Sequence, residues 1–218
     1  MNKLTIIVTY YNAEEYITGC LESIKQQRTQ DFNLIIVNDG STDQSKKLMD
    51  EAIKDYDKNI RFIDLDENSG HAHARNIALE EVETPYFMFL DADDELASYA
   101  ITFYLEKFNN TDGLIAPIHS FTTQRPQFVD LDRVRVEYFN AKENINSFLR
   151  KQSACNIIFR TAIVRAHHIR FNENLNTYVD WSFVLEYMKY VNKFVRIFNF
   201  PFYFRGEVYD PFETLTLS

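Results

Sequence analysis

Short apolar runs alternate with amphipathic segments through the first ninety residues of the chain. Apolar side chains dominate four runs, at residues 4–8, 32–37, 61–65 and 86–90. Between them lie segments with the three- and four-residue spacing of helices, such as residues 16–24. This alternation is typical of βαβ units, whose parallel strands are covered by helices on both faces. The sequence therefore predicts an α/β fold with a Rossmann-like, mostly parallel central sheet flanked by helices.

The alternation of apolar runs and amphipathic segments is less regular in the second half of the chain. A helix is expected on the apolar face between Ile101 and Phe108, and a buried strand from Leu114 to Ile118. Residues 122–140 carry many charges and few clean periods, which indicates an irregular or edge-strand segment. Further elements are expected as helices near 142–150, near 161–167 and at 180–191, and as one or two strands between Phe194 and Phe204. No linker rich in Pro, Gly or Ser divides the chain, so residues 1–218 are expected to form a single domain.

The composition limits the classes of function. Hydrophobic residues make up 45% of the 218 residues, which is enough for a sizeable core, and the net charge is −9. An acidic surface repels nucleic acid and anionic membranes, so neither is expected as a general partner. No run approaches the roughly 20 apolar residues that span a bilayer, and residues 4–8 are too few for the core of a signal peptide. The chain is therefore expected to be cytoplasmic, with Cys20 and Cys155 as buried thiols.

Loops rich in hydrogen-bonding groups follow the four expected strands of the first half. They are Thr9-Tyr10-Tyr11-Asn12, Asn38-Asp39-Gly40-Ser41, Asn68-Ser69-Gly70-His71 and Asp91-Ala92-Asp93-Asp94. In an open parallel sheet the carboxyl ends of the strands meet at one edge, where ligands bind. Any one of these loops could be polar for conformational reasons alone, but four together favour a binding site.

Five segments of the sequence resemble the family 2 glycosyltransferases with the GT-A fold. They are IIVTYYN, IIVNDGSTD, ENSGHAHARNIAL, FMFLDADD and YVDWSF, in the family's order and spacing. The resemblance covers at least residues 4–95 and 153–187. It implies that residues 1–120 bind a nucleotide-diphospho-sugar, with UDP as the expected nucleotide, and that residues 121–218 face the acceptor. It also implies an inverting transfer of the sugar to an acceptor hydroxyl, with Mn²⁺ or Mg²⁺ as cofactor.

Asp91-Ala92-Asp93 matches the family's Asp-any-Asp motif. Alternate residues at the end of a strand can direct two carboxylates toward one ion and one ribose. Carboxylate and phosphate oxygens suit Mn²⁺ or Mg²⁺, and such a cation would offset the charge of a departing diphosphate. We expect Asp93 to contact the metal directly and Asp91 to contact the ribose or a metal-bound water. The alternative is an acidic turn before a helix, which is our interpretation of Asp94 and Glu95 because acidic residues are favoured at helix N-termini.

The resemblance assigns four further residues to the donor. Asp39 matches the acidic residue that meets the uracil or ribose, because a carboxylate can accept hydrogen bonds from the N–H of the base or from the ribose hydroxyls. The alternative is a plain Asp-Gly turn. Thr9 and Tyr11 match the segment that embraces the nucleobase, although many members have Pro in place of Thr9. Arg75 matches the arginine that reaches toward the base or diphosphate. Its alternative, a salt bridge along its own helix, lacks a charged partner three or four residues further on.

Asp180 matches the family's catalytic base, which takes the proton of the acceptor hydroxyl. Val179 stands where the usual Glu would be, so only the Asp of that motif is retained. Phe183 and Val184 follow by three and four residues, which places Asp180 on the inward face of a helix. Burial there would raise its pKa, whereas a helix N-terminus would lower it. The alternative is that Asp180 is only a helix cap.

The sequence leaves two alternative functions to consider. A nucleotidyltransferase would be expected to carry a Gly-rich, basic loop after its first strand, which Thr9 to Asn12 does not provide. A non-catalytic nucleotide-sugar-binding module, as the N-terminal domain of a longer cell-envelope enzyme, would keep the fold without turnover.

Family members often build cell-surface polymers, so the resemblance implies teichoic acid or capsule synthesis with a saccharide or polyol-phosphate acceptor. It is compatible with a homo-oligomer and with a peripheral location at the inner face of the cell membrane.

Overall fold

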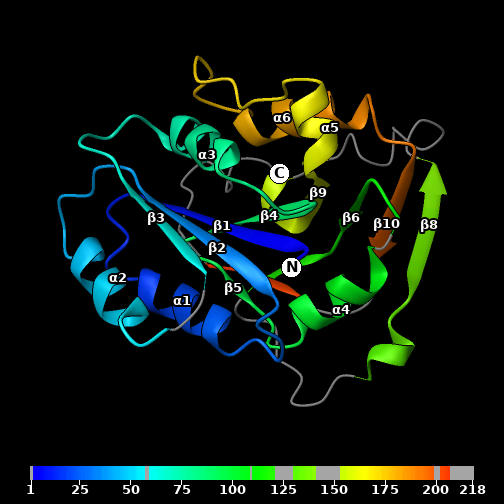
Figure 1. Ribbon diagram of the computed structural model, residues 1–218, viewed down its shortest axis with the longest axis horizontal. Coiled ribbons are helices and arrows are strands. Elements are labelled where there is room, and N and C mark those ends of the chain that lie inside the picture. Colours follow the sequence, from blue (N-terminus) through cyan, green and yellow to red (C-terminus); the bar gives the residue numbers. More distant parts are fainter. Residues whose placement is uncertain are drawn as a thin grey trace, which may run out of the picture.

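The central sheet of the computed structural model has eight strands in the order β3-β2-β1-β4-β9-β6-β10-β8 (Figure 1). The structure describes residues 2–56, 59–108, 110–120, 130–140, 153–198 and 202–206. The strands are β1 Leu4–Tyr10, β2 Phe32–Asn38, β3 Ile60–Asp64, β4 Tyr86–Asp91, β6 Gly113–Ile115, β8 Val136–Asn140, β9 Ile157–Arg160 and β10 Lys193–Ile197. The pairs β1–β2, β1–β4, β2–β3 and β6–β10 are parallel, which confirms the predicted α/β fold.

The second half of the chain contributes half of the central sheet. Strand β9 was not predicted: it inserts between β4 and β6 and pairs antiparallel with both. Its four residues, Ile157–Arg160, are too few for periodicity to separate a buried strand from a buried helix. Strand β8 pairs antiparallel with β10 at the edge of the sheet, so the expectation of an edge strand is confirmed for the described part of residues 122–140.

A second sheet of three strands, in the order β5-β11-β7, corrects two expectations. The single strand predicted from Leu114 to Ile118 is wrong, because the chain forms β6 and then β7, Ile118–Ser120, which lie in different sheets. Glu95 does not begin a helix but lies in β5, Glu95–Leu96, which pairs with β11, Tyr203–Arg205. Helix α4 begins only at Ala100.

Helices cover both faces of the central sheet (Figure 1). On one side lie α1 Ile17–Lys25, α2 Ser45–Ile53 and α4 Ala100–Lys107; on the other lie α3 His71–Glu80, α5 Thr161–Ala166 and α6 Val179–Met188. These helices match the expected ones to within a few residues, except that the helix predicted near 142–150 lies outside the described residues. In the part of the chain that the structure describes, no helix has the length and apolar character needed to cross a membrane.

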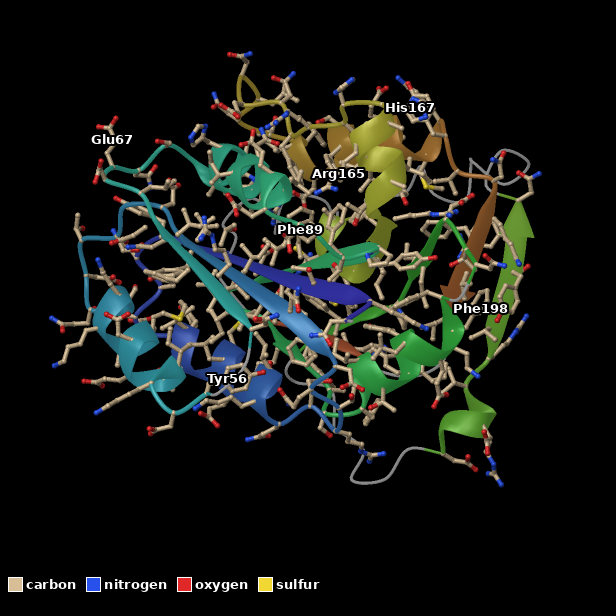
Figure 2. All side chains as sticks on the ribbon, viewed as in Figure 1. Tyr56, Glu67, Phe89, Arg165, His167 and Phe198 are labelled. Atoms are coloured by element: carbon tan, nitrogen blue, oxygen red, sulfur yellow. The ribbon has the colours of Figure 1, made fainter. Side chains whose placement is uncertain are left out.

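Aromatic rings fill the core between the sheet and α6. Phe89 of β4 lies inside the molecule, whereas Glu67, in the loop after β3, points into solvent (Figure 2). The Phe171 ring stacks on that of Phe183 with centroids 4.1 Å apart, and both pack edge-on against Phe89. Cys20 and Cys155 are buried free thiols, as predicted.

The register of the parallel strands brings the expected loops together. Thr9 of β1 pairs with Asp91 of β4, and Tyr10 pairs with Asn38 of β2. The carboxyl ends of these three strands therefore lie side by side, and the polar loops that follow them share one edge of the sheet, as expected.

Candidate active site

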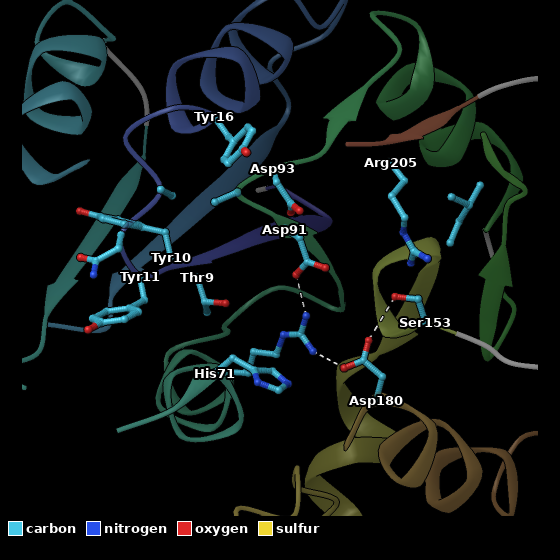
Figure 3. Close-up of a pocket in the computed structure, with 15 residues that line it drawn as sticks. Thr9, Tyr10, Tyr11, Tyr16, His71, Asp91, Asp93, Ser153, Asp180 and Arg205 are labelled. Carbon is cyan, nitrogen blue, oxygen red and sulfur yellow. Dashed lines mark hydrogen bonds and ion pairs between the residues drawn. The ribbon is translucent and has the colours of Figure 1, made fainter. Parts of the chain in front are cut away.

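A pocket of about 660 Å³ opens at the carboxyl ends of β1 and β4 (Figure 3). Six of the seven predicted site residues line it: Thr9, Tyr11, Arg75, Asp91, Asp93 and Asp180. They come from β1, α3, β4 and α6 and from the loops that follow β1 and β4, so segments up to 171 positions apart in the sequence meet at one site. Tyr11 and His71 lie on one side of the pocket, and Ser153 and Arg205 on the other.

Arg75 of α3 joins two walls of the pocket. Its Nη2 lies 2.6 Å from Oδ1 of Asp91, and its Nη1 donates to Oδ1 of Asp180. Only 4% of the Arg75 side chain is exposed, compared with 34% for Asp91 and 24% for Asp180. Burial by itself would lower the pKa of Arg75, but the charge of Asp91 raises it well above its usual value, so the guanidinium stays protonated.

Both carboxylate oxygens of Asp91 have protein partners. Arg75 donates to Oδ1, and the Cys155 thiol lies 3.1 Å from Oδ2. Cys155 is fully buried, and the adjacent charge of Asp91 adds to the effect of burial in raising the pKa of its thiol. Asp91 is thus held at the end of β4 by a guanidinium and a neutral thiol.

The carboxylate of Asp93 reaches the pocket, and its own backbone N–H is the one hydrogen-bond donor to it among the described residues. Burial, and then the charge of Asp91, raises its pKa above the ordinary value. Oxygen atoms of Asp91, Asp93 and Asp94 all lie within 4.8 Å of one another. Three crowded carboxylates repel one another, so a divalent cation with a preference for oxygen ligands fits this site.

Asp94 is buried rather than exposed at a helix start, which corrects our interpretation of it. Its Oδ2 accepts a hydrogen bond from the Tyr203 hydroxyl at 2.5 Å, and its Oδ1 accepts one from the Gly206 backbone N–H at 2.8 Å. Burial and the charge of Asp91 raise the pKa of Asp94 to about 7. The loop that carries Asp93 is therefore tied to the strand β11 near the other end of the chain.

Asp180 is not the cap of its helix. The N-cap of α6 is Tyr178, whose φ of 58° is left-handed and rare for a bulky residue, and Asp180 is the second residue of the helix. Its Oδ2 accepts hydrogen bonds from the Ser153 hydroxyl at 3.1 Å and the Ala154 backbone N–H at 2.9 Å. Burial opposes ionisation, but the charge of Arg75 and these hydrogen bonds outweigh it and hold the pKa of Asp180 below its ordinary value. The carboxylate is therefore ionised at neutral pH.

Asp39 is the predicted residue that does not line the pocket. It is buried, and its two oxygens accept hydrogen bonds from the backbone N–H groups of Ser69 and Gly70, each at 2.9 Å. Asp39 thus fastens the loop before α3 to the end of β2. Its contact with a nucleotide stays a prediction.

Four residues that contribute to the site were given no functional role from the sequence: His71, Ser153, Cys155 and Arg205. Burial and the charge of Arg75 lower the pKa of His71, which favours its neutral form. The positive charge of Arg205 acts on Asp93 and partly offsets the rise in its pKa. Ser153 belongs to none of the five matching segments and Arg205 lies beyond the residues that the resemblance covers, so only their place at the pocket identifies them.

Known proteins similar to this chain include several glycosyltransferases. An uncharacterized glycosyltransferase of Haemophilus influenzae is 29% identical over 195 residues, which cover 88% of this chain and 74% of that protein. The poly(ribitol-phosphate) beta-N-acetylglucosaminyltransferase TarS of Staphylococcus aureus is 28% identical over 201 residues. The match covers 85% of this chain but 32% of TarS, so the chain spans about a third of that relative.

Solved structures share the fold. The crystal structure of S. aureus TarS 1–349 in complex with UDP-GlcNAc has a TM-score of 0.79 at 23% identity, covering 99% of this chain and 62% of that one. A mannosyltransferase from Pyrobaculum calidifontis in complex with GDP-Man and Mn²⁺ has a TM-score of 0.64 at 15% identity, covering 88% of this chain and 53% of that one. At these identities the likeness shows the GT-A fold alone. The family model described as Glycosyl transferase family 2 matches residues 5–170, which is more than half of the chain, and the chain therefore belongs to this family of glycosyltransferases.

Proposed function

We propose that the protein transfers a sugar from a UDP-sugar to an acceptor hydroxyl with inversion at the anomeric carbon, assisted by a divalent cation. The observation that carries the proposal is the pairing of two different carboxylates in one pocket. Among the described residues, no other residue donates a hydrogen bond to Asp93, whose pKa is raised, whereas Asp180 is held ionised by Arg75. The Asp93 carboxylate is suited to binding a cation, and the Asp180 carboxylate is suited to accepting a proton.

The donor would occupy the side of the pocket formed by β1 and β4. Tyr11, 46% exposed, offers its ring to the nucleobase, and Thr9 lies beside Asp91 in the register of the sheet. Asp93 would ligate Mn²⁺ or Mg²⁺, which when bound would offset the charge of the departing diphosphate. Because Arg75 and Cys155 occupy both oxygens of Asp91, we expect that residue to reach the ribose or a metal-bound water through its remaining lone pairs.

Asp180 would act as the general base in a single displacement. The acceptor oxygen forms a bond to the anomeric carbon, its proton passes to Asp180, and the bond from the anomeric carbon to the diphosphate oxygen breaks. Because no enzyme nucleophile intervenes, the configuration inverts. The lowered pKa of Asp180 keeps the base ionised, and its proton transfer would accompany the attack rather than precede it.

The relatives suggest the chemical class of donor and acceptor. TarS is named for transfer of N-acetylglucosamine to poly(ribitol phosphate), and its solved complex contains UDP-GlcNAc. We therefore propose a hexosyl or N-acetylhexosaminyl donor and a saccharide or polyol-phosphate acceptor of a cell-surface polymer, made at the cytoplasmic face of the membrane. The alternative is a nucleotide-sugar-binding module without turnover, within a longer protein.

The test measures binding and turnover separately. Thermal shifts with UDP-GlcNAc, UDP-glucose and UDP-galactose, each with and without Mn²⁺, should show stabilisation that needs the metal. Asp93→Asn should abolish that stabilisation. Asp180→Asn should keep it, while the rate of UDP release in the presence of acceptor falls by about 1000-fold or more. Asp66→Asn, at an exposed site outside the pocket, is the matched control.

Two outcomes would contradict the proposal. If no UDP-sugar stabilises the wild-type protein in the presence of Mn²⁺, the proposed donor class is wrong. If UDP-sugar binds but no UDP is released with ribitol-phosphate or saccharide acceptors, and Asp180→Asn behaves as wild type, the non-catalytic alternative is favoured.

A further inference from the structure

The guanidinium of Arg75 contacts two carboxylates and a thiol through its two terminal nitrogens. Nη2 donates to Oδ1 of Asp91 and lies 3.4 Å from Sγ of Cys155, and Nη1 donates to Asp180. Its Nε is buried and has no hydrogen-bond partner among the described residues. The guanidinium is therefore an internal group at the back of the pocket, with 4% of its side chain exposed.

Two aromatic rings pack on one side of the same guanidinium, with their own centroids 5.2 Å apart. Its central carbon lies 5.2 Å from the ring centroid of Phe89 and 5.2 Å from that of Phe171. Contacts of this kind favour a cation over the ring face and orient the guanidinium plane.

The packing that holds Arg75 also holds the helix of the base. Asn76 exchanges hydrogen bonds with the backbone of Phe171, accepting from its N–H at 2.9 Å and donating to its carbonyl at 3.0 Å. Phe171 in turn stacks on Phe183, one turn beyond Asp180 on α6. The Arg75-Asn76 pair therefore fixes α6 through an ion pair and through an aromatic stack.

We propose that Arg75 is a positioning residue that sets Asp180 relative to Asp91, and that it does not bind the sugar nucleotide. This inference rests on the proposed function and departs from the donor-binding role that the resemblance implies for Arg75. If the guanidinium turned its bonded N–H groups toward a diphosphate, it would leave Asp91 or Asp180. Either move would leave a largely buried carboxylate without its cation, which is the more costly arrangement.

Arg75→Gln tests the inference, because it removes the cation and keeps a polar side chain. UDP affinity in the presence of Mn²⁺, measured by calorimetry, should stay within about threefold of wild type. The turnover number should fall by about 100-fold, since small misplacements of a catalytic group have effects of this size. The acid limb of the pH profile of kcat should move to higher pH, because Asp180 loses the positive charge that favours its ionised form.

A double-variant comparison separates positioning from donor binding. If Arg75 acts through Asp180, Arg75→Gln should lower turnover by less than about twofold when it is added to Asp180→Asn. If Arg75 binds the diphosphate, the two losses should multiply and UDP affinity should fall in Arg75→Gln alone. Either of the latter results would overturn the inference.

Two further variants guard against trivial outcomes. Arg75→Lys keeps the charge in case the Gln variant does not fold. A single ammonium group cannot reproduce the two-sided bridge, so its turnover should fall while UDP affinity is kept. Arg160→Gln removes a half-buried ion pair with Asp112 at the opposite end of β4 and should change none of these readouts.

Failure of wild-type protein to bind UDP would count against the proposed function, whereas loss of UDP affinity in Arg75→Lys and Arg75→Gln would count against this inference alone.

Discussion

The hydroxyl group of Tyr203 lies 2.5 Å from Oδ2 of Asp94, and the backbone N–H of Asp91 donates to the same hydroxyl at 3.3 Å. Tyr203 therefore holds both ends of the turn that carries Asp93. Tyr203 and Asp94 are 109 positions apart in the sequence. Their side chains meet because β11 pairs with β5 directly after the turn. The shape of the candidate metal site depends on a strand near the other end of the chain.

Tyr203→Phe should destabilise the protein and weaken cation binding. The change leaves Oδ2 of buried Asp94 without its hydroxyl donor, which costs about 2 kcal/mol of unfolding free energy. Urea denaturation measures that loss, and the Mn²⁺-dependent thermal shift with UDP should be smaller than in wild type. Tyr138→Phe, at a residue 54% exposed on the edge strand β8, is the control and should leave both quantities unchanged. Equal effects of the two variants would rule out the role given to Tyr203.

The contribution of Asp94 to the stability of the metal-free protein should fall as the pH rises from about 4 to about 8. The folded-state pKa of Asp94, about 7, lies above its ordinary value of 3.8, so folding favours the protonated acid. This contribution is complete below pH 3.8 and is lost as the pH rises through 7. The displacement corresponds to about 4 kcal/mol at most.

Asp94→Asn isolates this contribution from those of other acidic groups. The difference in unfolding free energy between wild type and Asp94→Asn should change with pH in EDTA, because the other acidic groups are common to both proteins. Urea titrations at several pH values give that difference. A difference that is flat between pH 4 and 8 would show that Asp94 ionises normally in the folded protein.

Asp93→Asn should stabilise the metal-free protein slightly. At neutral pH the Asp93 carboxylate is charged, half-buried and repelled by Asp91, as its raised pKa indicates. Replacing it with a neutral amide should add about 1 kcal/mol or less in EDTA, as is common for functional residues that are strained in the free protein. The same variant should lose stabilisation by Mn²⁺ and UDP. A destabilised metal-free variant would mean that Asp93 has a structural partner.

Gly40→Ala should destabilise the loop that follows β2. Gly40 has a φ of 66°, and an added Cβ would lie 2.6 Å from the backbone nitrogen of Asn68. Both the left-handed backbone and this contact oppose a side chain, so a loss of about 2–3 kcal/mol is expected in urea denaturation. Gly70→Ala is a matched control, because its φ is also positive, at 90°, but an added Cβ would meet no atom within 4 Å. It should cost less than Gly40→Ala.

Much of the first half of the fold could be predicted from local pattern. Strands such as Leu4–Tyr10 are covered on both faces, so their apolar runs are unbroken, and the helices between them keep one apolar face. The second half was harder, because strands such as Ile157–Arg160 are short and pair with segments far away in the chain. The division of residues 113–120 into two strands depends on which sheet each part joins, and local sequence does not contain that information.

The sequence by itself determined the family, the α/β architecture and the acidic and polar residues that gather at the carboxyl edge of the sheet. Residue type and spacing along parallel strands are enough for this, since neighbouring strand ends must meet. Only the tertiary structure decided what each of these residues contacts. It assigned Asp94 to Tyr203, Asp39 to the backbone of Ser69 and Gly70, and Arg75 to both Asp91 and Asp180. These partners lie 30 or more positions away, apart from Asp91, and burial and neighbouring charge set the ionisation of each carboxylate only once the chain is folded.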